Sequence, residues 1–223
     1  MDPGYRLTGL VADPPTRRPD APIAPRRVGR DKTGRMRLFA AVWPPAGVLR
    51  WLDGLPRPAV PGLRWTGIDQ WHVTLVFYGE VPEEDLPLVA AALGRAARSM
   101  PEAPVAAVGD RTLLLGRDVL YAPVSGLDVL VAGVRDATRP WVGDDAPFTG
   151  HLTLARASGG RAVPGTLVGT PLPAAGAEGA AGAGGSASSW VVDEACLVVS
   201  SSTPTGSRYR TAASAGIGPA SAG

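Results

Sequence analysis

His72-Val73-Thr74-Leu75 and His151-Leu152-Thr153-Leu154 are two copies of one pattern, a histidine followed by threonine two positions later and leucine three positions later. They contain both histidines of the 223-residue sequence. From the threonine and leucine content, the chance that both histidines carry this pattern is roughly four in 10⁵. We therefore interpret the repeat as a duplicated functional element.

The repeat predicts a β-strand for each copy. In a strand, residues i and i+2 project from one face, and residues i+1 and i+3 project from the other. His72 and Thr74 then share a face, while Val73 and Leu75 enter the core beneath them. Residues 151–154 repeat this arrangement. Two such strands side by side would form a cleft with paired imidazoles and hydroxyls, which suits a phosphodiester.

Paired imidazoles favour acid-base chemistry on that phosphodiester. Phosphoryl transfer to water needs one group that takes a proton from the nucleophile and another that gives a proton to the leaving oxygen. Imidazole serves both purposes near neutral pH because its unperturbed pKa is about 6.5. Threonine hydroxyls can donate hydrogen bonds to the non-bridging oxygens.

The histidines also have two simpler interpretations. A single histidine on a strand is more often a satisfied structural side chain, but the duplication favours catalysis. A metal site is the other alternative, and two histidines without a nearby acidic cluster fall short of the usual three or four ligands. The sequence thus predicts a reaction without a metal or a cofactor.

The remaining hydrophobic patterns predict alternating strands and helices. Strands are expected at 37–43, 71–78, 105–108, 119–124, from 151 onward, and at 190–200. Helices are expected after Pro44-Pro45, at 83–99 and at 127–138. The order is strand, helix, strand, helix, twice over.

Composition predicts one folded domain with irregular ends. Residues 1–35 read as a disordered Pro/Arg-rich leader, which a translation start at Met36 would remove. Residues 36–211 form the expected domain, residues 171–189 an Ala/Gly-rich flexible insertion within it, and residues 212–223 a disordered tail.

Charge and residue usage exclude several classes of protein. The leader holds eight basic and four acidic residues, whereas the rest of the chain holds 14 basic and 16 acidic residues. Phosphate affinity must therefore come from a few placed groups rather than from a broad basic field. Lys32 is the only lysine, so the domain lacks the amine that Schiff-base enzymes, nucleotidyl-lysine ligases and P-loop NTPases require. Cys196 is the sole cysteine, so the chain cannot form an intrachain disulfide. The sequence shows no candidate membrane span or signal peptide, and the chain is therefore expected to be cytoplasmic.

With these motifs in place, the sequence resembles the 2H phosphoesterase superfamily, in particular the RNA 2′,3′-cyclic phosphodiesterases historically labelled 2′-5′ RNA ligases. The resemblance covers about residues 36–211. It rests on the opening run 36–40, the two histidine motifs at 71–81 and 148–156, and the closing pattern at 190–200 with Gly206 and Tyr209. It implies an α+β fold: two pseudo-symmetric lobes of mainly antiparallel sheet, with flanking helices, around a central cleft. One departure is Gly150, where many relatives have proline.

The resemblance also implies roles for individual residues. His151 would be the proton acceptor that activates water, and His72 the proton donor to the departing 3′ oxygen, which leaves a 2′-phosphomonoester. Thr74, Thr153 and Arg156 would bind the substrate. The expected partner is an RNA or oligonucleotide end with a 2′,3′-cyclic phosphate. The protein is expected to be a monomer and not to bind a membrane.

Several alternatives remain open at this point. The same fold could act on a small cyclic nucleotide such as ADP-ribose cyclic phosphate, or on 2′-5′ linked oligonucleotides. A non-catalytic RNA-binding protein is a further possibility. Tyr121 and Phe148 could stack on a base, although aromatic residues beside strands more often belong to the core.

Overall fold

The computed structural model describes residues 34–143, 146–173, 188–203 and 206–219. Residues 1–33 of the expected leader and most of the expected insertion at 171–189 lie outside the described residues, whereas Arg35, the last residue assigned to the leader, begins the first strand. Among the helices of the described part, none is long and apolar enough to cross a membrane.

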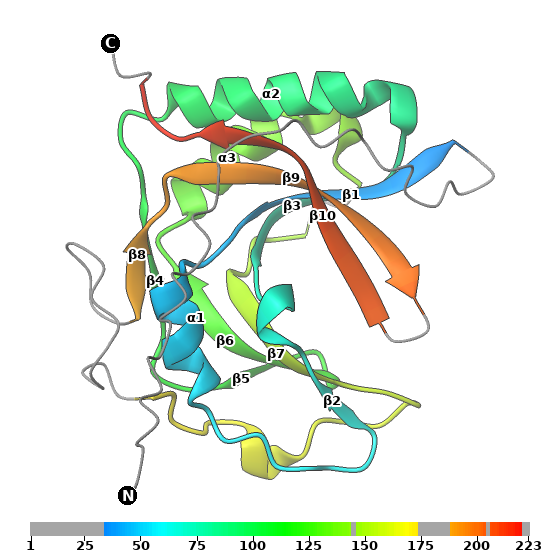
Figure 1. Ribbon diagram of the computed structural model, residues 1–223, viewed down its shortest axis with the longest axis vertical. Coiled ribbons are helices and arrows are strands. Elements are labelled where there is room, and N and C mark those ends of the chain that lie inside the picture. The colour runs from blue at the N-terminus through cyan, green and yellow to red at the C-terminus, as the bar shows by residue number, and fades with distance from the viewer. Residues whose placement is uncertain (1–33, 144–145, 174–187, 204–205, 220–223) are drawn as a thin grey trace, which may run out of the picture. The chain divides into compact units, whose positions relative to one another are not determined.

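An antiparallel sheet is the framework of the described chain (Figure 1). Its strands follow the spatial order β10-β9-β1-β3-β7-β6-β4-β8, with β2 paired to β7 and β5 paired to β6. The strands are β1 (Arg35–Val42), β2 (Leu63–Trp65), β3 (Val73–Pro82), β4 (Val105–Val108), β5 (Leu113–Leu115), β6 (Val119–Ser125), β7 (His151–Ala157), β8 (Ser189–Val191), β9 (Glu194–Thr203) and β10 (Gly206–Gly216). All pairings between these strands are antiparallel. The α+β class and the mainly antiparallel sheet predicted from the sequence are confirmed.

The sheet has two lobes that meet at the two histidine strands. The first lobe comprises β10, β9, β1 and β3, and the second comprises β7, β6, β4 and β8 with β2 and β5. Val73 and Leu152, both 0% exposed, form the one described backbone pairing between β3 and β7. The antiparallel register at this pair sets each histidine of the repeat across from the threonine of the other copy. All four polar side chains therefore project from the face opposite to the buried pair.

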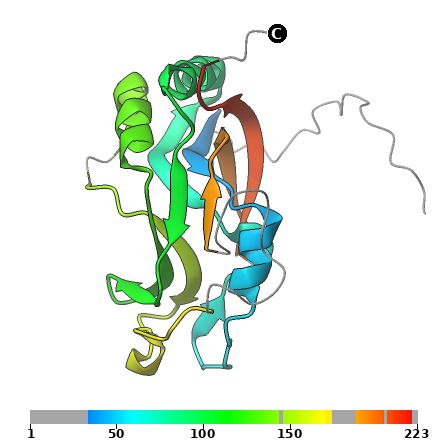
Figure 2. The same ribbon diagram turned by 90° about the vertical axis from the view of Figure 1, so that its left-hand side faces the viewer.

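Two of the α-helices cover the first lobe on one face. The α-helices are α1 (Ala46–Asp53), α2 (Leu86–Ser99) and α3 (Asp128–Ala137), and the 3₁₀ helices are η1 (Ile68–Gln70), η2 (Glu83–Asp85), η3 (Arg139–Trp141) and η4 (Gly165–Leu167). α2 and α3 pack against each other beside β9, β10 and β3 (Figures 1 and 2). Pro87 favours the first turn of α2, and Val89, Leu93 and Ala96 form its buried stripe at helical spacing.

The other face of the first lobe carries a smaller apolar cluster. Leu38, Ala40 and Val42 of β1 belong to the main core, whereas Phe39 and Ala41 alternate to the opposite face. There they pack with buried side chains of β9. This second cluster lies beneath the functional site described below.

Three expectations about strands need correction, and two further strands were not expected. Residues 190–200 form two strands rather than one, because β8 pairs with β4 in the second lobe and β9 pairs with β1 in the first. The strand expected at 71–78 spans Val73–Pro82 instead, because Gly79, with φ of +73° and a neighbouring bulge, lets β3 continue past residue 78. β2 and β5 have no counterpart among the expected strands, and β10 contains the Gly206 and Tyr209 of the resemblance. β10 also includes residues 212–216, which were assigned to a disordered tail.

A buried hydroxyl joins the segment before the first histidine to β7. Thr66 is 8% exposed, and its Oγ1 lies 2.5 Å from the carbonyl oxygen of Thr153 and 2.9 Å from that of Leu154. The same Oγ1 accepts a hydrogen bond of 2.9 Å from Nε1 of Trp71, which is 1% exposed. The two histidine strands are thus held together by this side-chain bond as well as by the single backbone pair.

Replacing Thr66 with valine removes this hydroxyl while keeping the shape of the side chain. The Thr66→Val variant leaves the Trp71 indole N–H buried without its acceptor, so the free energy of unfolding should fall by about 1–3 kcal/mol in urea denaturation. Thr166→Val is the matched control at an exposed threonine and should change it by less than about 0.5 kcal/mol. Equal effects of the two substitutions would contradict the role given to Thr66.

Candidate active site

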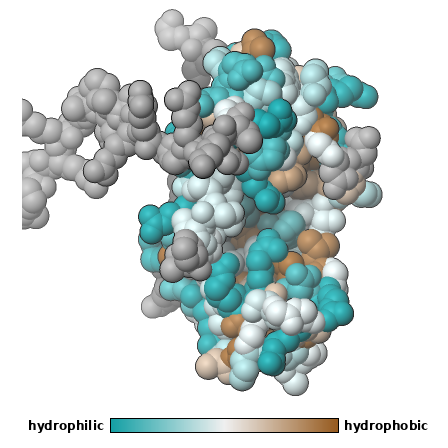
Figure 3. Space-filling model, turned by 90° about the vertical axis from the view of Figure 1, so that its right-hand side faces the viewer, coloured by the Kyte–Doolittle hydropathy of each residue, from teal (hydrophilic) through white to brown (hydrophobic). Residues whose placement is uncertain are grey.

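A small pocket lies where the two lobes meet. It encloses about 100 Å³ and is lined by Arg64, Thr66, Gln70, His72, Thr74, His151, Thr153, Arg156, Ser207 and Tyr209. We call it the histidine pocket. The five residues predicted to act on or bind substrate all line it. Figure 3, which faces the side of the molecule with β2 and the β9-β10 end, shows a hollow at mid-height with hydrophilic and hydrophobic side chains at its walls.

Both histidine rings are oriented in the same way. Nδ1 of His72 lies 2.7 Å from the carbonyl oxygen of Gln70, and Nδ1 of His151 lies 2.7 Å from that of Thr149. A carbonyl oxygen can only accept, so Nδ1 carries a hydrogen in each ring. In the neutral form, Nε2 is then the basic nitrogen, and this leaves one proton-transfer atom on each ring.

Aromatic side chains enclose the first histidine. The His72 ring stacks on Phe39 with 5.0 Å between centroids, and it meets Tyr209 edge-on at 4.7 Å and Trp43 at 5.4 Å. His151 has one such neighbour, Tyr121, at 5.5 Å. The first ring is therefore held more rigidly and is more shielded from water than the second.

The two aromatic residues proposed from the sequence to stack on a base lie outside the pocket. Tyr121 is 8% exposed and supports His151 from the side. Phe148 is partly buried and packs against the main core. The resemblance included Tyr209 but gave it no role, and this residue instead lines the pocket beside His72.

The electrostatic environment of His72 favours its neutral form. Burial lowers the pKa of His72 from 6.5 to about 4, and the positive charges of His151 and Arg156 act in the same direction. The hydrogen bond to the Gln70 carbonyl opposes them by raising this pKa. An anion between these groups would offset the repulsion and raise the pKa of His72.

A second arginine, which sequence reasoning missed, stands beside Arg156. Arg64 pairs directly with Arg156 across β2 and β7, so both side chains project from the same face and both line the pocket. Gly206, with φ of +127°, leaves room for the Arg64 guanidinium, whose Nη1 would lie 2.6 Å from a Cβ at that position. Arg64 thus reaches from the second lobe to the β9-β10 end of the first. A three-residue strand such as β2 carries too short a pattern for this pairing to be predicted.

The chemistry of the pocket is that of an anion site. Within the part of the chain that the structure describes, its lining consists of two arginines, two histidines, hydroxyl groups and one amide, without a carboxylate. Among the described residues, no group of three or more His, Cys, Asp and Glu side chains could hold a metal ion. Guanidinium groups and hydroxyls that converge on a phosphate-sized space favour a phosphate group as the ligand.

Gln70 connects three parts of the site. Its carbonyl oxygen orients His72, while its side-chain Nε2 donates a 2.7 Å hydrogen bond to the carbonyl oxygen of Ser207 at the start of β10. Its Oε1 accepts a 3.3 Å hydrogen bond from the Gly67 amide. Gln70 therefore fixes the distance between η1 and the strand that carries Tyr209.

Gly150 has a steric role just before the second histidine. A Cβ at this position would lie 2.1 Å from the carbonyl oxygen of Val124 on β6. The Val124 amide also donates a 2.9 Å hydrogen bond to the Gly150 carbonyl. The departure from proline noted in the sequence thus coincides with a close approach of two backbones, which sets the entry of His151 into β7.

The protonation of His72 can be followed directly, because the chain has only two histidines. In ¹H-¹⁵N NMR titration of the imidazoles, His72 is expected to titrate near pH 4, with Nδ1–H retained in the neutral ring. His151→Gln provides the assignment and should raise the pKa of His72, since one repelling positive charge is lost.

Inorganic phosphate supplies the second part of this measurement. Saturating phosphate should raise the pKa of His72. By linkage, the affinity of the protein for phosphate should increase as the pH falls from 7 toward 4. A His72 ring that titrates near pH 6.5, and does so equally with and without phosphate, would contradict the electrostatic description.

Part of the sequence matches a known protein family. Residues 42–109 match the family described as LigT like Phosphoesterase. The matched segment includes the first histidine motif and ends before the second. A comparison with curated protein sequences finds no match.

Solved structures extend the similarity over most of the chain. The TT0787 protein of Thermus thermophilus is 28% identical, with 82% of this chain and 98% of that chain covered at a TM-score of 0.62. Apo LigT of E. coli is 23% identical, with 83% and 99% covered at 0.61, and LigT complexed with 3′-AMP is 23% identical, with 82% and 98% covered at 0.58. These proteins share the curled antiparallel sheet with few helices.

Proposed function

We propose that this chain, which is similar to the LigT-like phosphoesterases over residues 42–109 and in its fold, is a 2H phosphoesterase that hydrolyses 2′,3′-cyclic phosphates at RNA ends to 2′-phosphomonoesters. The observation that carries the proposal is a phosphate-sized pocket with two equivalently oriented imidazoles and no carboxylate in its lining. An anionic diester fits this charge, and the two free Nε2 atoms supply the two proton transfers that its hydrolysis needs.

The reaction is a single displacement at phosphorus. Nε2 of His151 takes a proton from a water molecule as its oxygen forms a bond to phosphorus. The bond between phosphorus and the 3′ oxygen breaks, and that oxygen receives a proton from Nε2 of His72. The product is a 2′-phosphomonoester with a free 3′-hydroxyl, and both rings return to their starting states after one proton exchange with solvent.

The remaining pocket residues stabilise the charge on the phosphoryl oxygens. Thr74 and Thr153 each share a strand face with a histidine, so their hydroxyls can donate to the non-bridging oxygens. Arg156, with Arg64 beside it, offers guanidinium donors in the same pocket. Charge increases on these oxygens in the transition state, so such donors bind the transition state more strongly than the ground state.

The assignment of acid and base follows the resemblance to 2H phosphoesterases. The lowered pKa of His72 supports the opposite assignment, in which the neutral His72 ring takes the proton from water. Under the first assignment, the bound diester raises the pKa of His72, and the ring acquires the proton that it later donates. In both assignments the two rings hold one proton between them. The assignments differ in which alanine variant recovers activity with a substrate whose leaving group needs no proton.

The class of substrate is supported by what a structural neighbour binds. E. coli LigT has been crystallised with 3′-AMP, NADP+, ATP and phosphate, so its fold accommodates nucleotides. For this chain we propose an RNA end as the substrate, with a small cyclic nucleotide or a 2′-5′ linkage as the alternative. Turnover that rises with RNA length favours RNA, and turnover that ignores length favours the small molecule. Ligation would be the reverse of ring opening and would need no ATP.

The proposal includes the setting of the reaction. We expect the protein to act in the cytoplasm as a monomer and without a cofactor, and activity should therefore persist in the presence of a chelator. An RNA-binding protein without turnover remains the alternative from another class. It would retain RNA affinity and show no hydrolysis at any pH.

The leaving group separates the roles of the histidines. His72→Ala and His151→Ala should each lower turnover of a nucleoside 2′,3′-cyclic phosphate by about 10²–10⁴-fold. With bis(4-nitrophenyl) phosphate, whose nitrophenolate leaves without a proton, His72→Ala should regain most of the wild-type rate and His151→Ala should not. Arg95→Ala, at an exposed position of α2, is the matched surface control. The reverse pattern would establish the opposite assignment, and full activity of either alanine variant would refute the mechanism.

The pH dependence of kcat/KM follows from the same protonation states. One ring must be neutral to take a proton from water, so kcat/KM should fall once both rings are protonated. For His72 this requires a pH below about 4. It should also fall at higher pH, when the pair loses its remaining proton. An initial-rate profile that is flat from pH 4 to pH 9 would be incompatible with paired-histidine catalysis.

A further inference from the structure

A second and larger cavity opens beside the histidine pocket. It is open to solvent on one side and has a volume of about 370 Å³, compared with about 100 Å³ for the histidine pocket. Gln70, Ser207 and Tyr209 line both spaces, so the two are neighbours with a shared wall. A group attached to a phosphate in the histidine pocket can therefore extend into this larger space, whose volume is in the range of a small-molecule site.

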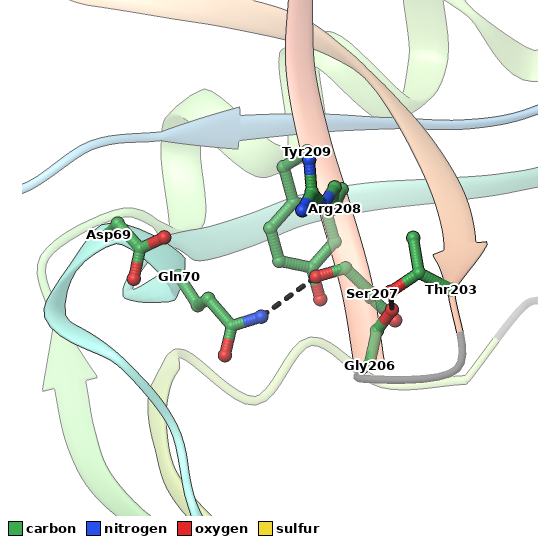
Figure 4. Close-up of a pocket in the computed structure, with 7 residues that line it drawn as sticks. All are labelled: Asp69, Gln70, Thr203, Gly206, Ser207, Arg208 and Tyr209. Atoms are coloured by element: carbon green, nitrogen blue, oxygen red, sulfur yellow. Dashed lines mark hydrogen bonds between the residues drawn. The ribbon is translucent and has the colours of Figure 1, made fainter.

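Two charged side chains are available to a ligand in the larger cavity. Asp69 on η1 and Arg208 on β10 line it from opposite sides, and both side chains are exposed (Figure 4). Neither one forms an ion pair or a hydrogen bond with another described side chain. Gln70 differs from them, because both polar atoms of its amide are already hydrogen-bonded to backbone groups. Asp69 and Arg208 are thus the groups that can select a ligand, and Gln70 forms a fixed wall.

The carboxylate decides which part of a nucleotide fits. A second phosphate would meet the negative charge of Asp69, whereas a nucleobase offers N–H donors to that carboxylate. Ring nitrogens and carbonyl oxygens of the same base can accept from the Arg208 guanidinium. A neutral group with both donors and acceptors matches the opposed charges, and a nucleoside has this property.

We propose that the 370 Å³ cavity between η1 and the start of β10 is a nucleoside subsite, in which Asp69 and Arg208 bind the base of the nucleotide whose phosphate lies in the histidine pocket. The proposal rests on the proposed function, because it takes the histidine pocket as the phosphate site. It implies that recognition of a base-bearing substrate is separable from catalysis. Asp69 and Arg208 determine affinity for the nucleoside, whereas the histidines determine the rate.

Equilibrium binding tests the subsite without requiring turnover. Isothermal titration calorimetry with the full chain would compare inorganic phosphate with the 2′-monophosphates of adenosine, guanosine, cytidine and uridine. At least one nucleotide should bind the wild type about tenfold more tightly than phosphate does, since a hydrogen bond to a charged group contributes at about this level. Asp69→Ala and Arg208→Ala should each weaken that nucleotide by about tenfold and leave phosphate binding unchanged. Asp128→Ala and Arg95→Ala, exposed on α3 and α2, are the matched controls and should change neither affinity.

The outcomes separate this inference from the proposed function. Nucleotides that bind no more tightly than phosphate, or that bind the Asp69→Ala and Arg208→Ala variants as they bind the wild type, would overturn the subsite even if the protein hydrolyses cyclic phosphates. Nucleotide binding that depends on Asp69 and Arg208, in a protein that hydrolyses no diester, would support the subsite and refute the proposed function.

Discussion

The site depends on how tightly two strands from distant parts of the sequence are held together at one point. Val73 and Leu152 form the one described backbone pair between β3 and β7, and both are fully buried. A shift of one residue in either strand would turn its histidine and threonine into the core. The bonds of Thr66 to Trp71 and to the β7 backbone oppose such a shift. Register at this junction therefore determines whether the two rings share a pocket.

Burial and charge then give the two rings unequal properties. Aromatic side chains surround His72, which lowers its pKa to about 4, and the nearby cations Arg156 and His151 add to this effect. The unliganded pocket thus brings together groups that repel one another, and an anion offsets that repulsion. Because only an anion relieves this repulsion, the pocket binds a phosphate group in preference to a neutral one. The neighbouring cavity, which includes the carboxylate of Asp69, has a different charge pattern and so a different preference.

Much of the site follows from local sequence, and the rest depends on long-range pairing. The duplicated motif predicted which faces of β3 and β7 carry His72 and His151, because strand alternation is a property of neighbouring residues. The hydrophobic run at 190–200 could not reveal that the chain passes from one lobe to the other near Asp193, since the identity of the partner strand is absent from the run itself. Arg64 lies on a three-residue strand. Gln70 acts through its backbone carbonyl, which orients His72, and through its side-chain amide, which bonds to the backbone of Ser207. Neither contribution has a sequence pattern.

The central claim is that both rings contact one phosphorus centre at the same time. A crystal structure of the protein with inorganic phosphate tests it most directly. The account predicts one phosphate in the histidine pocket, with Nε2 of His72 and Nε2 of His151 each within about 3.2 Å of a different oxygen of that phosphate. A phosphate that contacts only one of the two rings, or that binds elsewhere while the pocket stays empty, would contradict it.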